Sequence, residues 1–552
     1  MLVQLVLNKA HFLTFYMTKT LEGSLGMQYG EFPNKTITAP QRAIQVNTNF
    51  DQILNERKDS IEDRLGPDQF PDNTNPQIGT VNTHYEVGER NQVISSGGIG
   101  AIHQMVQGLG LIENINNQLH VLKRHLPYHE SDHVLNIAYN ALLGGSRLED
   151  IELRRRDESF LDALNAPRIP DPTTAGDFTR RFGEQDIKDL MGAINHTRTG
   201  LYTHLAKQNK QPKFMQRAYV DADGTIAGTT GESKEGMALS YKGIWGYAPL
   251  VISLANTKEV LFLVNRSGNK VSHDGWAPWA DEAIELISPH AEKICLRGDT
   301  DFSTTVDFDR WDEQGIEFVF GMDAHPKLKG LAGAIAEEGW QKLERPPKYT
   351  ITTKGRVRPE NHKEKFIKAK EYKNLKLLSE DITEFEYRPT KCGKDYRMVV
   401  IRKNISVEKG ELDLGDEIRY FFYITNRRDI SAAEVVGLAN RRCDQENVIE
   451  QLKNGVNAMR MPVGDLMSNW AYMVMAGLAW NLKAWFGLLV PDAKRSREIV
   501  TMEFRRFWQG VIMIPAQVVK TARKVVLRLM GYNSWMKTLL DTWEVLRGVR
   551  IA

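Results

Sequence analysis

The sequence predicts an α/β protein built on a mixed β-sheet, with a β-rich insertion and with helical regions on either side of the sheet. Two observations support this class. Residues 216–325 alternate between short apolar runs, which are typical of strands, and amphipathic stretches, which are typical of helices. Residues 96–215 show helical periodicity with helix-capping residues. A chain of 552 residues has room for several domains.

The composition is that of an ordinary globular protein, with 41% hydrophobic and 26% charged residues. The net charge is only +2, so a surface that binds nucleic acid would have to come from local clusters of basic residues. Cys295, Cys392 and Cys443 are too widely spaced to suggest a zinc site or a disulfide framework, which favours a reducing cytoplasm. The apolar run Trp470 to Trp480 is too short to span a bilayer, so we expect a buried core helix and no membrane partner.

The first 215 residues divide into two parts. Residues 1–95 are expected to form a loosely ordered arm, because residues 21–95 are rich in Asn, Gln, Pro and Thr and show little periodicity. Residues 96–215 are expected to form several short helices, two of which carry the clusters Arg154–Arg156 and Arg180–Arg181. Local sequence favours neither of two interpretations, a packing domain with solvated arginines or a DNA-binding domain.

Residues 216–325 give a definite order of elements. Three strands are followed by a helix, a strand, a short helix and a final strand, at 219–225, 249–255, 260–264, 277–288, 293–299, 307–311 and 316–320. This is the order of the RNase H-like fold. Its first and fourth strands are neighbours, so Asp223 and Asp299 should come together although they lie far apart in the sequence.

The segment between Asp299 and Glu446 is longer than such a fold needs, which predicts a β-rich insertion domain at 326–426. Strands are expected within it at 384–387, 396–402 and 419–425. Its leading segment, Lys354 to Lys376, holds nine Lys or Arg residues against three Glu. It is interpreted as a phosphate-contacting arm, with a solvated loop as the alternative.

The core is expected to resume at 427–490, and 491–552 to form a C-terminal helical region that includes Arg523–Arg528. Within the resumed core, Arg442, Glu446 and Lys453 fall within roughly 40° of one another on a helix. Such a face is often only a solvated helix with an i,i+4 ion pair.

These motifs resemble those of the DDE transposases of bacterial insertion sequences. The family signature is Tyr, two residues, Arg, three residues, Glu, six residues, Lys, and this chain matches three of its four positions, with Ala439 in place of the Tyr. Asp223, in Tyr219-Val-Asp-Ala-Asp-Gly-Thr, and Asp299, at the end of Arg-Gly-Asp, resemble the first and second acidic motifs. The resemblance implies that Asp223, Asp299 and Glu446 are the catalytic residues.

The resemblance also implies cofactors and partners. The three acids would hold two Mg²⁺ or Mn²⁺ ions, and Arg442, Lys453 and Arg297 would contact DNA. The reaction would be nicking at transposon ends and strand transfer into target DNA. The partners would be double-stranded terminal inverted repeats and target DNA, bound by a homodimer in the bacterial cytoplasm at the nucleoid, with 96–215 as the end-binding region.

Two alternatives and one ambiguity stay open at this point. Asp221-Ala-Asp-Gly-Thr also fits a haloacid-dehalogenase-like phosphohydrolase, with Asp221 as nucleophile and Asp223 as general acid. A catalytically inactive, transposase-derived DNA-binding protein would have the same sequence features. Within the transposase interpretation, either Asp221 or Asp223 could be the first acid, and Asp223 is preferred because it precedes Gly-Thr.

Overall fold

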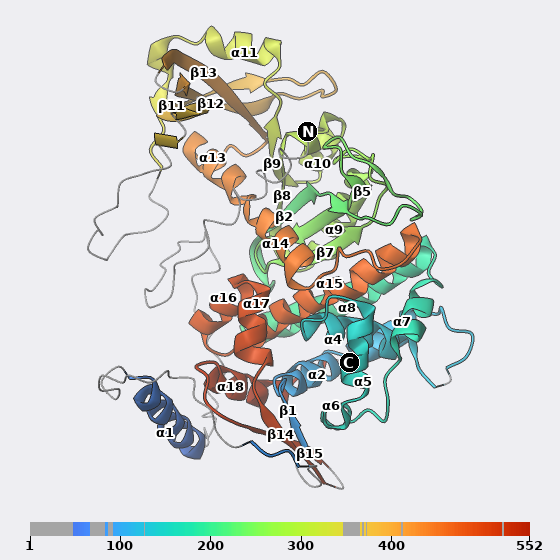
Figure 1. Cartoon of the computed structure of the whole chain (residues 1–552). Helices are drawn as coiled ribbons and strands as arrows, with labels where there is room; N and C mark the ends of the chain where they lie inside the picture. The colour runs from blue at the N-terminus through green and yellow to red at the C-terminus, as the bar shows by residue number, and fades with distance from the viewer. Residues whose placement is uncertain are drawn as a thin grey trace.

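The computed structural model describes residues 48–66, 83–86, 92–125, 127–345, 365–366, 369–370, 372–409, 412–521 and 524–551. These residues fold into a nine-stranded mixed sheet at one end of the structure and a helical body at the other end. The long helix α15 (Leu466–Leu489) lies between them (Figure 1).

Five strands of the sheet form the RNase H-like core. They are arranged in the order β9-β8-β2-β6-β7, with bounds β2 (Met215–Gly224), β6 (Leu250–Leu254), β7 (Glu259–Val264), β8 (Ala291–Gly298) and β9 (Glu317–Met322). Helices α9 (Trp276–Ile287) and α10 (Phe308–Glu313) connect the later strands. The first and fourth strands, β2 and β8, pair in parallel with Asp221 opposite Arg297, which confirms the expected neighbourhood.

Helix α15 holds the edge strand β7 of this core. The Asn481 side chain accepts a hydrogen bond from the Val260 amide (2.9 Å) and donates one to the Val260 carbonyl (3.0 Å), so it stands in for a neighbouring strand. The indole of Trp480 donates to the Lys258 carbonyl at 2.6 Å. The predicted buried core helix is confirmed. In the part of the chain with described structure, no helix combines the length and apolarity needed to cross a membrane.

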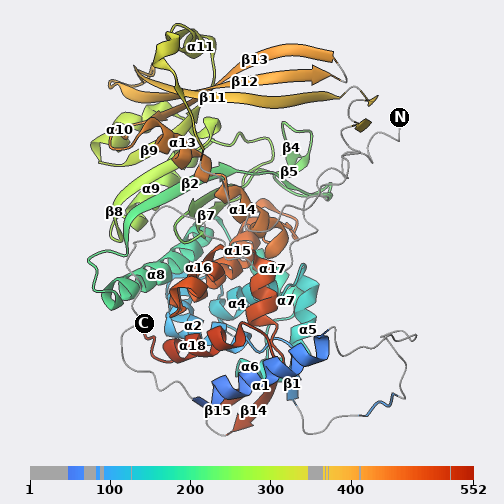
Figure 2. The ribbon, with the colours of Figure 1, turned by 90° about the vertical axis from the view of Figure 1, so that its left-hand side faces the viewer.

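The strands of the insertion continue the core sheet. After α11 (Pro326–Gly333), the short 3-10 helix η5 (Glu337–Gly339) and the short β10 (Gln341–Lys342) come three long antiparallel strands, β11 (Lys373–Tyr387), β12 (Tyr396–Lys409) and β13 (Leu412–Thr425). β13 pairs with β9, with Thr425 opposite Val319. The expected strands lie within β11, β12 and β13, which extend beyond the core (Figure 2). Most of the basic segment Lys354 to Lys376 lies outside the described residues.

The helical body combines segments from both halves of the chain. Its earlier helices are α2 (Ile99–Gly108), α3 (Leu111–Gln118), α4 (Glu130–Leu142), η2 (Leu148–Ile151), α5 (Glu152–Arg155), α6 (Glu158–Ala163), α7 (Pro172–Thr179) and α8 (Glu184–Gln208). Its later ones are α16 (Ala493–Thr501), α17 (Phe504–Phe507), η7 (Trp508–Ile512) and α18 (Met536–Leu546). Both groups pack against α15, and a fully buried ion pair between Arg198 and Glu259 (2.8 Å) joins α8 to the sheet.

The structure bears on two expectations at the ends of the chain: the described parts of residues 1–95 include ordered elements, and the expectation that residues 491–552 are helical is wrong at 516–521 and 524–529. The arm contains helix α1 (Thr48–Leu65) and strand β1 (Gln92–Ile94), and Arg57 of α1 donates to the Leu529 and Gly531 carbonyls. The C-terminal region, expected to be helical, contains a hairpin of β14 (Ala516–Thr521) and β15 (Lys524–Leu529). Consecutive valines in both strands favour the extended backbone, and β1 pairs with β14.

Candidate active site

The carboxyl ends of the parallel strands β2 and β8 meet a third segment of the chain. This segment consists of α13 (Ala432–Arg441), α14 (Asp444–Glu450) and the π-helical turn η6 (Gln451–Gly455), where the sequence predicted one helix. The buried Gln445 fixes α14 to the sheet, because its side-chain amide donates to the carbonyls of Asp221 (3.0 Å) and Val251 (2.9 Å). This anchor turns the predicted face of Arg442 and Glu446 toward the end of β2.

Arg442 lies among the three predicted acids. Its guanidinium Nη1 donates to Asp223 Oδ2 at 3.1 Å, and its Nη2 lies 3.9 Å from Glu446 Oε1. Asp299 also interacts electrostatically with Arg442, as the mutual shifts of their pKa values indicate. One cation is therefore shared by carboxylates from β2, from the end of β8 and from α14.

Burial and nearby charges set the proton affinity of Asp223 and Asp299. Burial raises the pKa of Asp223 to about 6; the nearby Arg442 opposes this rise, whereas Asp299 and Glu446 add to it. Burial likewise raises the pKa of Asp299, again against the effect of Arg442. Although burial disfavours the charged form of Arg442, Asp223 and Asp299 raise its pKa. The acids are thus close enough to compete for negative charge.

The backbone around Asp299 fixes the position of its carboxylate. Asp299 caps the short helix η3 (Thr300–Phe302), and its Oδ1 accepts a hydrogen bond from the Asp301 amide at 3.0 Å. The preceding Gly298 packs so closely that a Cβ atom there would lie 2.6 Å from Phe302 Cβ. A larger residue at position 298 would therefore displace the turn that presents Asp299.

Asp221 has a different environment from Asp223. Its side chain is 1% exposed and pairs in bidentate geometry with the guanidinium of Arg297, at 2.7 and 2.8 Å. Arg297 also donates to the Leu438 carbonyl at 3.2 Å, which links β8 to α13. The bidentate pair with Asp221 joins β8 to β2, and the bond to the Leu438 carbonyl joins both strands to α13. Asp223 therefore faces the site, whereas Asp221 lies beneath it.

This geometry corrects two sequence-based interpretations. Arg297 was predicted to contact DNA, but its side chain is 3% exposed and is fully engaged with Asp221 and Leu438. The phosphohydrolase alternative required Asp221 as an accessible nucleophile on a strand followed by a helical crossover. The buried ion pair occupies Asp221, and the next strand of the same sheet, β6, pairs with β2 in antiparallel orientation.

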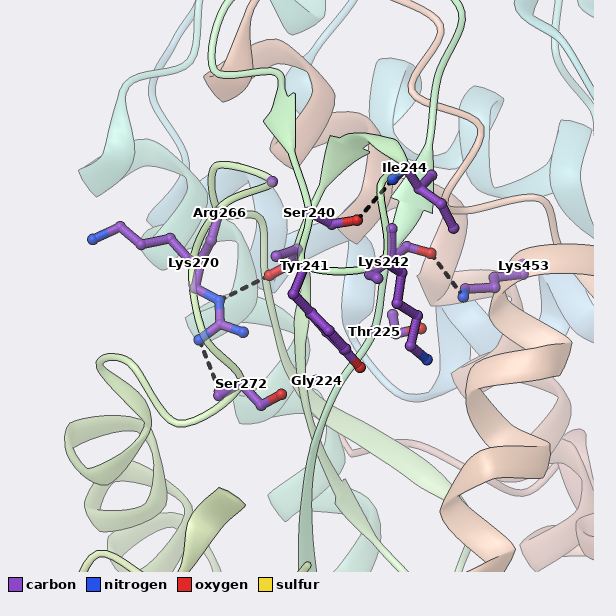
Figure 3. Close-up of a pocket in the computed structure, with 13 residues that line it drawn as sticks. Gly224, Thr225, Ser240, Tyr241, Lys242, Ile244, Arg266, Lys270, Ser272 and Lys453 are labelled. Atoms are coloured by element: carbon purple, nitrogen blue, oxygen red, sulfur yellow. Dashed lines mark hydrogen bonds between the residues drawn. The ribbon is translucent and has the colours of Figure 1, made fainter. Parts of the chain in front are cut away.

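Lys453 lies next to the acids, on the side where β2 ends. Its Nζ donates to the Ile226 carbonyl at 2.9 Å, and burial lowers its pKa. It lines a cavity of about 260 Å³ together with the end of β2, a hairpin and the loop around Lys270 (Figure 3). The hairpin belongs to a small sheet of β3 (Ala227–Gly228), β4 (Ala238–Leu239) and β5 (Trp245–Tyr247). The sequence alone did not predict this cavity.

The donor set of the site suits a hard divalent cation. Asp223, Asp299 and Glu446 offer only carboxylate oxygens, which Mg²⁺ and Mn²⁺ prefer. Burial is the main cause of the raised pKa of Asp223, with Asp299 and Glu446 adding to it, and a bound cation would favour the ionised form of this carboxylate. The three residues are therefore suitable ligands for a metal, although their carboxylate oxygens do not all lie within 4.8 Å of one another in this structure.

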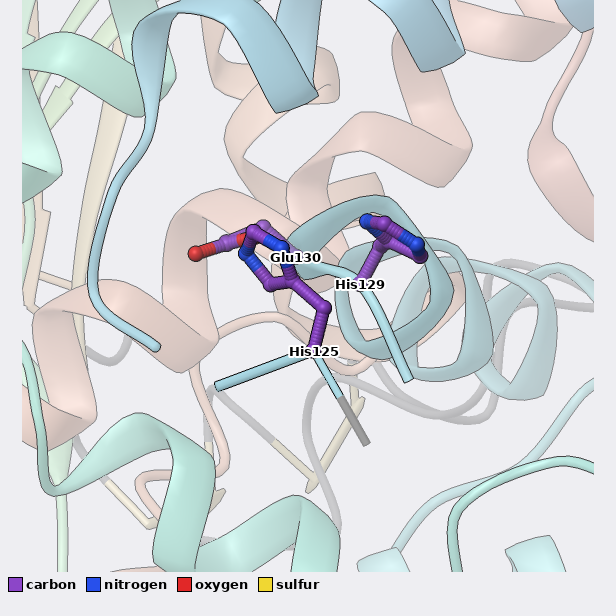
Figure 4. A group of neighbouring side chains, drawn as sticks. All are labelled: His125, His129 and Glu130. Carbon is purple, nitrogen blue, oxygen red and sulfur yellow. The ribbon is translucent and has the colours of Figure 1, made fainter. Parts of the chain in front are cut away.

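A second group of potential metal ligands lies at the start of α4, in the helical body. Among the described residues, only the donor atoms of His125, His129 and Glu130 all lie within 4.8 Å of one another (Figure 4). Glu130 already accepts a hydrogen bond from the Leu122 amide (3.0 Å), and its Oε2 lies 3.0 Å from His125 Nε2. These contacts hold the preceding loop against α4 and account for the group without an ion.

Comparison with known proteins places the chain in context. The family model described as "Transposase DDE domain group 1" matches residues 87–551. Among solved structures, the chain is similar to the piggyBac transposase in its synaptic complex with hairpin DNA, at 10% sequence identity and a TM-score of 0.32, over 76% of this chain and 86% of that one. No curated protein matches the sequence.

Proposed function

Because the chain belongs to the DDE-domain transposase family, we propose that it nicks the DNA ends of an insertion sequence and joins them to target DNA. In this proposal Asp223, Asp299 and Glu446 are the catalytic carboxylates. The substrate is double-stranded DNA, comprising the terminal inverted repeats and the target, and the acting species is a homodimer assembled on that DNA. The reaction takes place in the bacterial cytoplasm, at the nucleoid.

The observation that carries this proposal is the single cation shared by three distant acids. Asp223, Asp299 and Glu446 come from separate chain segments, yet each interacts with the guanidinium of Arg442. A purely structural ion pair needs one carboxylate. Gathering three at the ends of parallel strands opposes folding through charge repulsion, and this kind of arrangement is concentrated at functional sites.

The three acids are proposed to hold two Mg²⁺ or Mn²⁺ ions. Held by Asp223, Asp299 and Glu446, such ions would supply activation of a water or 3′-hydroxyl and charge stabilisation of the leaving oxygen in an in-line phosphoryl transfer. Arg442 keeps Asp223 ionised in the free protein, because the charged neighbour opposes the rise in its pKa. Lys453 and Arg442 supply positive charge beside the acids and are proposed to contact phosphates of the bound DNA.

A nicking assay on DNA that carries the ends of the encoding element tests the proposal. Glu446→Gln keeps the side-chain shape but removes a ligand charge, so cleavage should fall at least about a hundredfold while end binding survives. Glu450→Gln is the matched control, since Glu450 is an exposed acid one turn further along the same segment and, among the described residues, accepts a hydrogen bond from Asn454 alone.

Two results would contradict the proposal. Normal cleavage by the Glu446→Gln variant would exclude Glu446 as a catalytic residue. End binding by the unaltered protein without cleavage in either Mg²⁺ or Mn²⁺ would identify an inactive, transposase-derived DNA-binding protein.

A further inference from the structure

Arg442 is held more loosely than Arg297, the other arginine beside these acids. A guanidinium has five N–H donors. Arg297 makes three hydrogen bonds, two to Asp221 and one to the Leu438 carbonyl, and its side chain is 3% exposed. Among the described residues, the Arg442 side chain donates one hydrogen bond, to Asp223, and it is 12% exposed. Arg442 therefore has few bonds to lose when its guanidinium moves.

The guanidinium of Arg442 lies between two of the proposed catalytic carboxylates. Its Nη1 is 3.1 Å from Asp223 Oδ2, and its Nη2 is 3.9 Å from Glu446 Oε1. The two nitrogens thus face different acids. A divalent ion bound by both carboxylates at about 2.0–2.1 Å would have to lie in this same space. Arg442 and such an ion therefore exclude each other from the position between Asp223 and Glu446.

Glu446 is free to change its position when the guanidinium leaves. Its side chain is 64% exposed, and its only ion pair among the described residues is the contact of 3.9 Å with Arg442. Gln445 holds the backbone of α14 to the sheet, so the remaining freedom lies in the Glu446 side chain. The oxygens of the three acids, which do not all lie within 4.8 Å of one another here, can then approach more closely.

The charge of Arg442 also opposes the binding of a second cation. Asp223 and Asp299 raise the pKa of Arg442, and Arg442 in turn opposes the rise in their pKa values. Its positive charge therefore acts on the same carboxylates that would bind a metal. Charges a few ångströms apart interact several times more strongly near a protein than in bulk water, so either cation weakens the binding of the other.

We propose that Arg442 is a displaceable counter-ion that keeps divalent metal out of the active site until DNA is bound. In the DNA-free protein its guanidinium lies where an ion shared by Asp223 and Glu446 would lie. A phosphate of the bound DNA draws the guanidinium away, because it can accept two hydrogen bonds from an arginine where Asp223 accepts one. This inference rests on the proposed function, because it requires both DNA and metal at the three acids.

The test measures the binding of Mn²⁺ to the full-length, DNA-free protein by electron paramagnetic resonance, which detects the free ion. Arg442→Gln removes the charge, so the affinity for Mn²⁺ should rise at least about tenfold. Arg441→Gln is the matched control, since Arg441 is the adjacent, exposed arginine at the end of α13, and it should change the affinity little. Adding Glu446→Gln to Arg442→Gln should remove the gain, which would assign the ion to the three acids.

A second variant covers the case in which Arg442→Gln does not fold. Arg442→Lys keeps a cation among the acids, but lysine carries a compact charge on a flexible stem and cannot contact two acids through a rigid fork. It should therefore be displaced more easily than arginine. The affinity of Arg442→Lys for Mn²⁺ should lie above that of the unaltered protein and below that of Arg442→Gln.

A further measurement tests the release of Arg442 by DNA. Because coupling between two ligands is reciprocal, DNA that opens the site to metal must itself bind more tightly when metal is present. Ca²⁺, which is expected to support little cleavage, should therefore favour binding of the ends of the encoding element by the unaltered protein more than by Arg442→Gln. The comparison of the two proteins cancels the general screening of phosphates by Ca²⁺.

Two results would overturn the inference. An affinity for Mn²⁺ that does not rise in Arg442→Gln, or in Arg442→Lys if only that variant folds, would mean that Arg442 holds the acids together rather than excluding an ion from them. An equal effect of Ca²⁺ on DNA binding by the unaltered protein and by the Arg442 variant would exclude release by DNA. Normal cleavage by the Glu446→Gln variant would instead overturn the proposed function, so the failures are distinct.

Discussion

Replacing Asp223 by Asn should make the protein more stable at neutral pH. Burial raises the pKa of Asp223 from 3.8 to about 6, with Asp299 and Glu446 adding to the rise. The folded protein therefore binds a proton at Asp223 more tightly than the unfolded chain does. As the pH rises from below 3.8 to above about 6, the folded state loses stability relative to the unfolded chain, because the folded protein must give up a proton that it holds more tightly than the unfolded chain does.

The size of the effect follows from the two pKa values. At about 1.4 kcal/mol per pKa unit, the ionised Asp223 lowers the free energy of unfolding by about 3 kcal/mol at pH 7.5. At pH 4.5 the same relation gives about 1 kcal/mol, and below pH ~3.5 the effect vanishes. Asparagine mimics the neutral carboxyl and removes this penalty, so the gain in stability of the Asp223→Asn variant should shrink as the pH is lowered.

Urea unfolding followed by tryptophan fluorescence at pH 7.5 and 4.5 measures this difference. Glu450→Gln is the control and should change neither midpoint, because Glu450 is exposed. A variant with Asn at position 223 that is no more stable than the parent at pH 7.5 would refute the reasoning. So would a gain that is equally large at both pH values, since it would not arise from the ionisation of Asp223.

Three further outcomes are expected. Cleavage should require Mg²⁺ or Mn²⁺, and Ca²⁺ should support DNA binding in a gel-shift assay but little cleavage, because its larger and looser coordination shell fits the site poorly. Arg297→Ala should lower the free energy of unfolding by roughly 3–5 kcal/mol, since it leaves Asp221 buried without its cation. The same variant should leave the dependence of DNA affinity on salt concentration unchanged. A weaker dependence on salt would show that Arg297 contacts DNA after all. Neutralising several lysines between Lys354 and Lys376 should weaken binding to all DNA sequences alike and reduce the salt slope by about 0.9 for each phosphate that the segment no longer neutralises, whereas an unchanged slope would exclude the segment as a phosphate-contacting arm.

The core of the fold was predictable because its signals are local. Each of the five core strands, β2, β6, β7, β8 and β9, contains an apolar run with clear boundaries, and the order of elements alone implies that β2 and β8 are neighbours. The hairpin of β14 and β15 was harder to predict: its consecutive valines favour the extended backbone, but its partner β1 lies about 400 residues away in sequence.

The candidate site was predictable in its residue types but not in its interactions. Spacing placed Arg442 and Glu446 on one face, whereas the family resemblance implied the same role for Arg442 and Arg297. Only the folded chain distinguishes them, because Arg442 reaches Asp223 whereas Arg297 is sealed against Asp221. The cavity beside Lys453 involves four separate segments, and no motif in any one of them indicates it.

The continuity of the nine-stranded sheet gives the insertion a mechanical property. Hydrogen bonds run without a break from β2, which carries Asp223, through β8 and β9 to β13, β12 and β11. At about 4.8 Å per strand, β11 lies roughly 24 Å from β2 along the sheet. The insertion is therefore a stiff extension of the sheet rather than a hinged flap, so a ligand held against its far strands would be kept at a set distance from the acids.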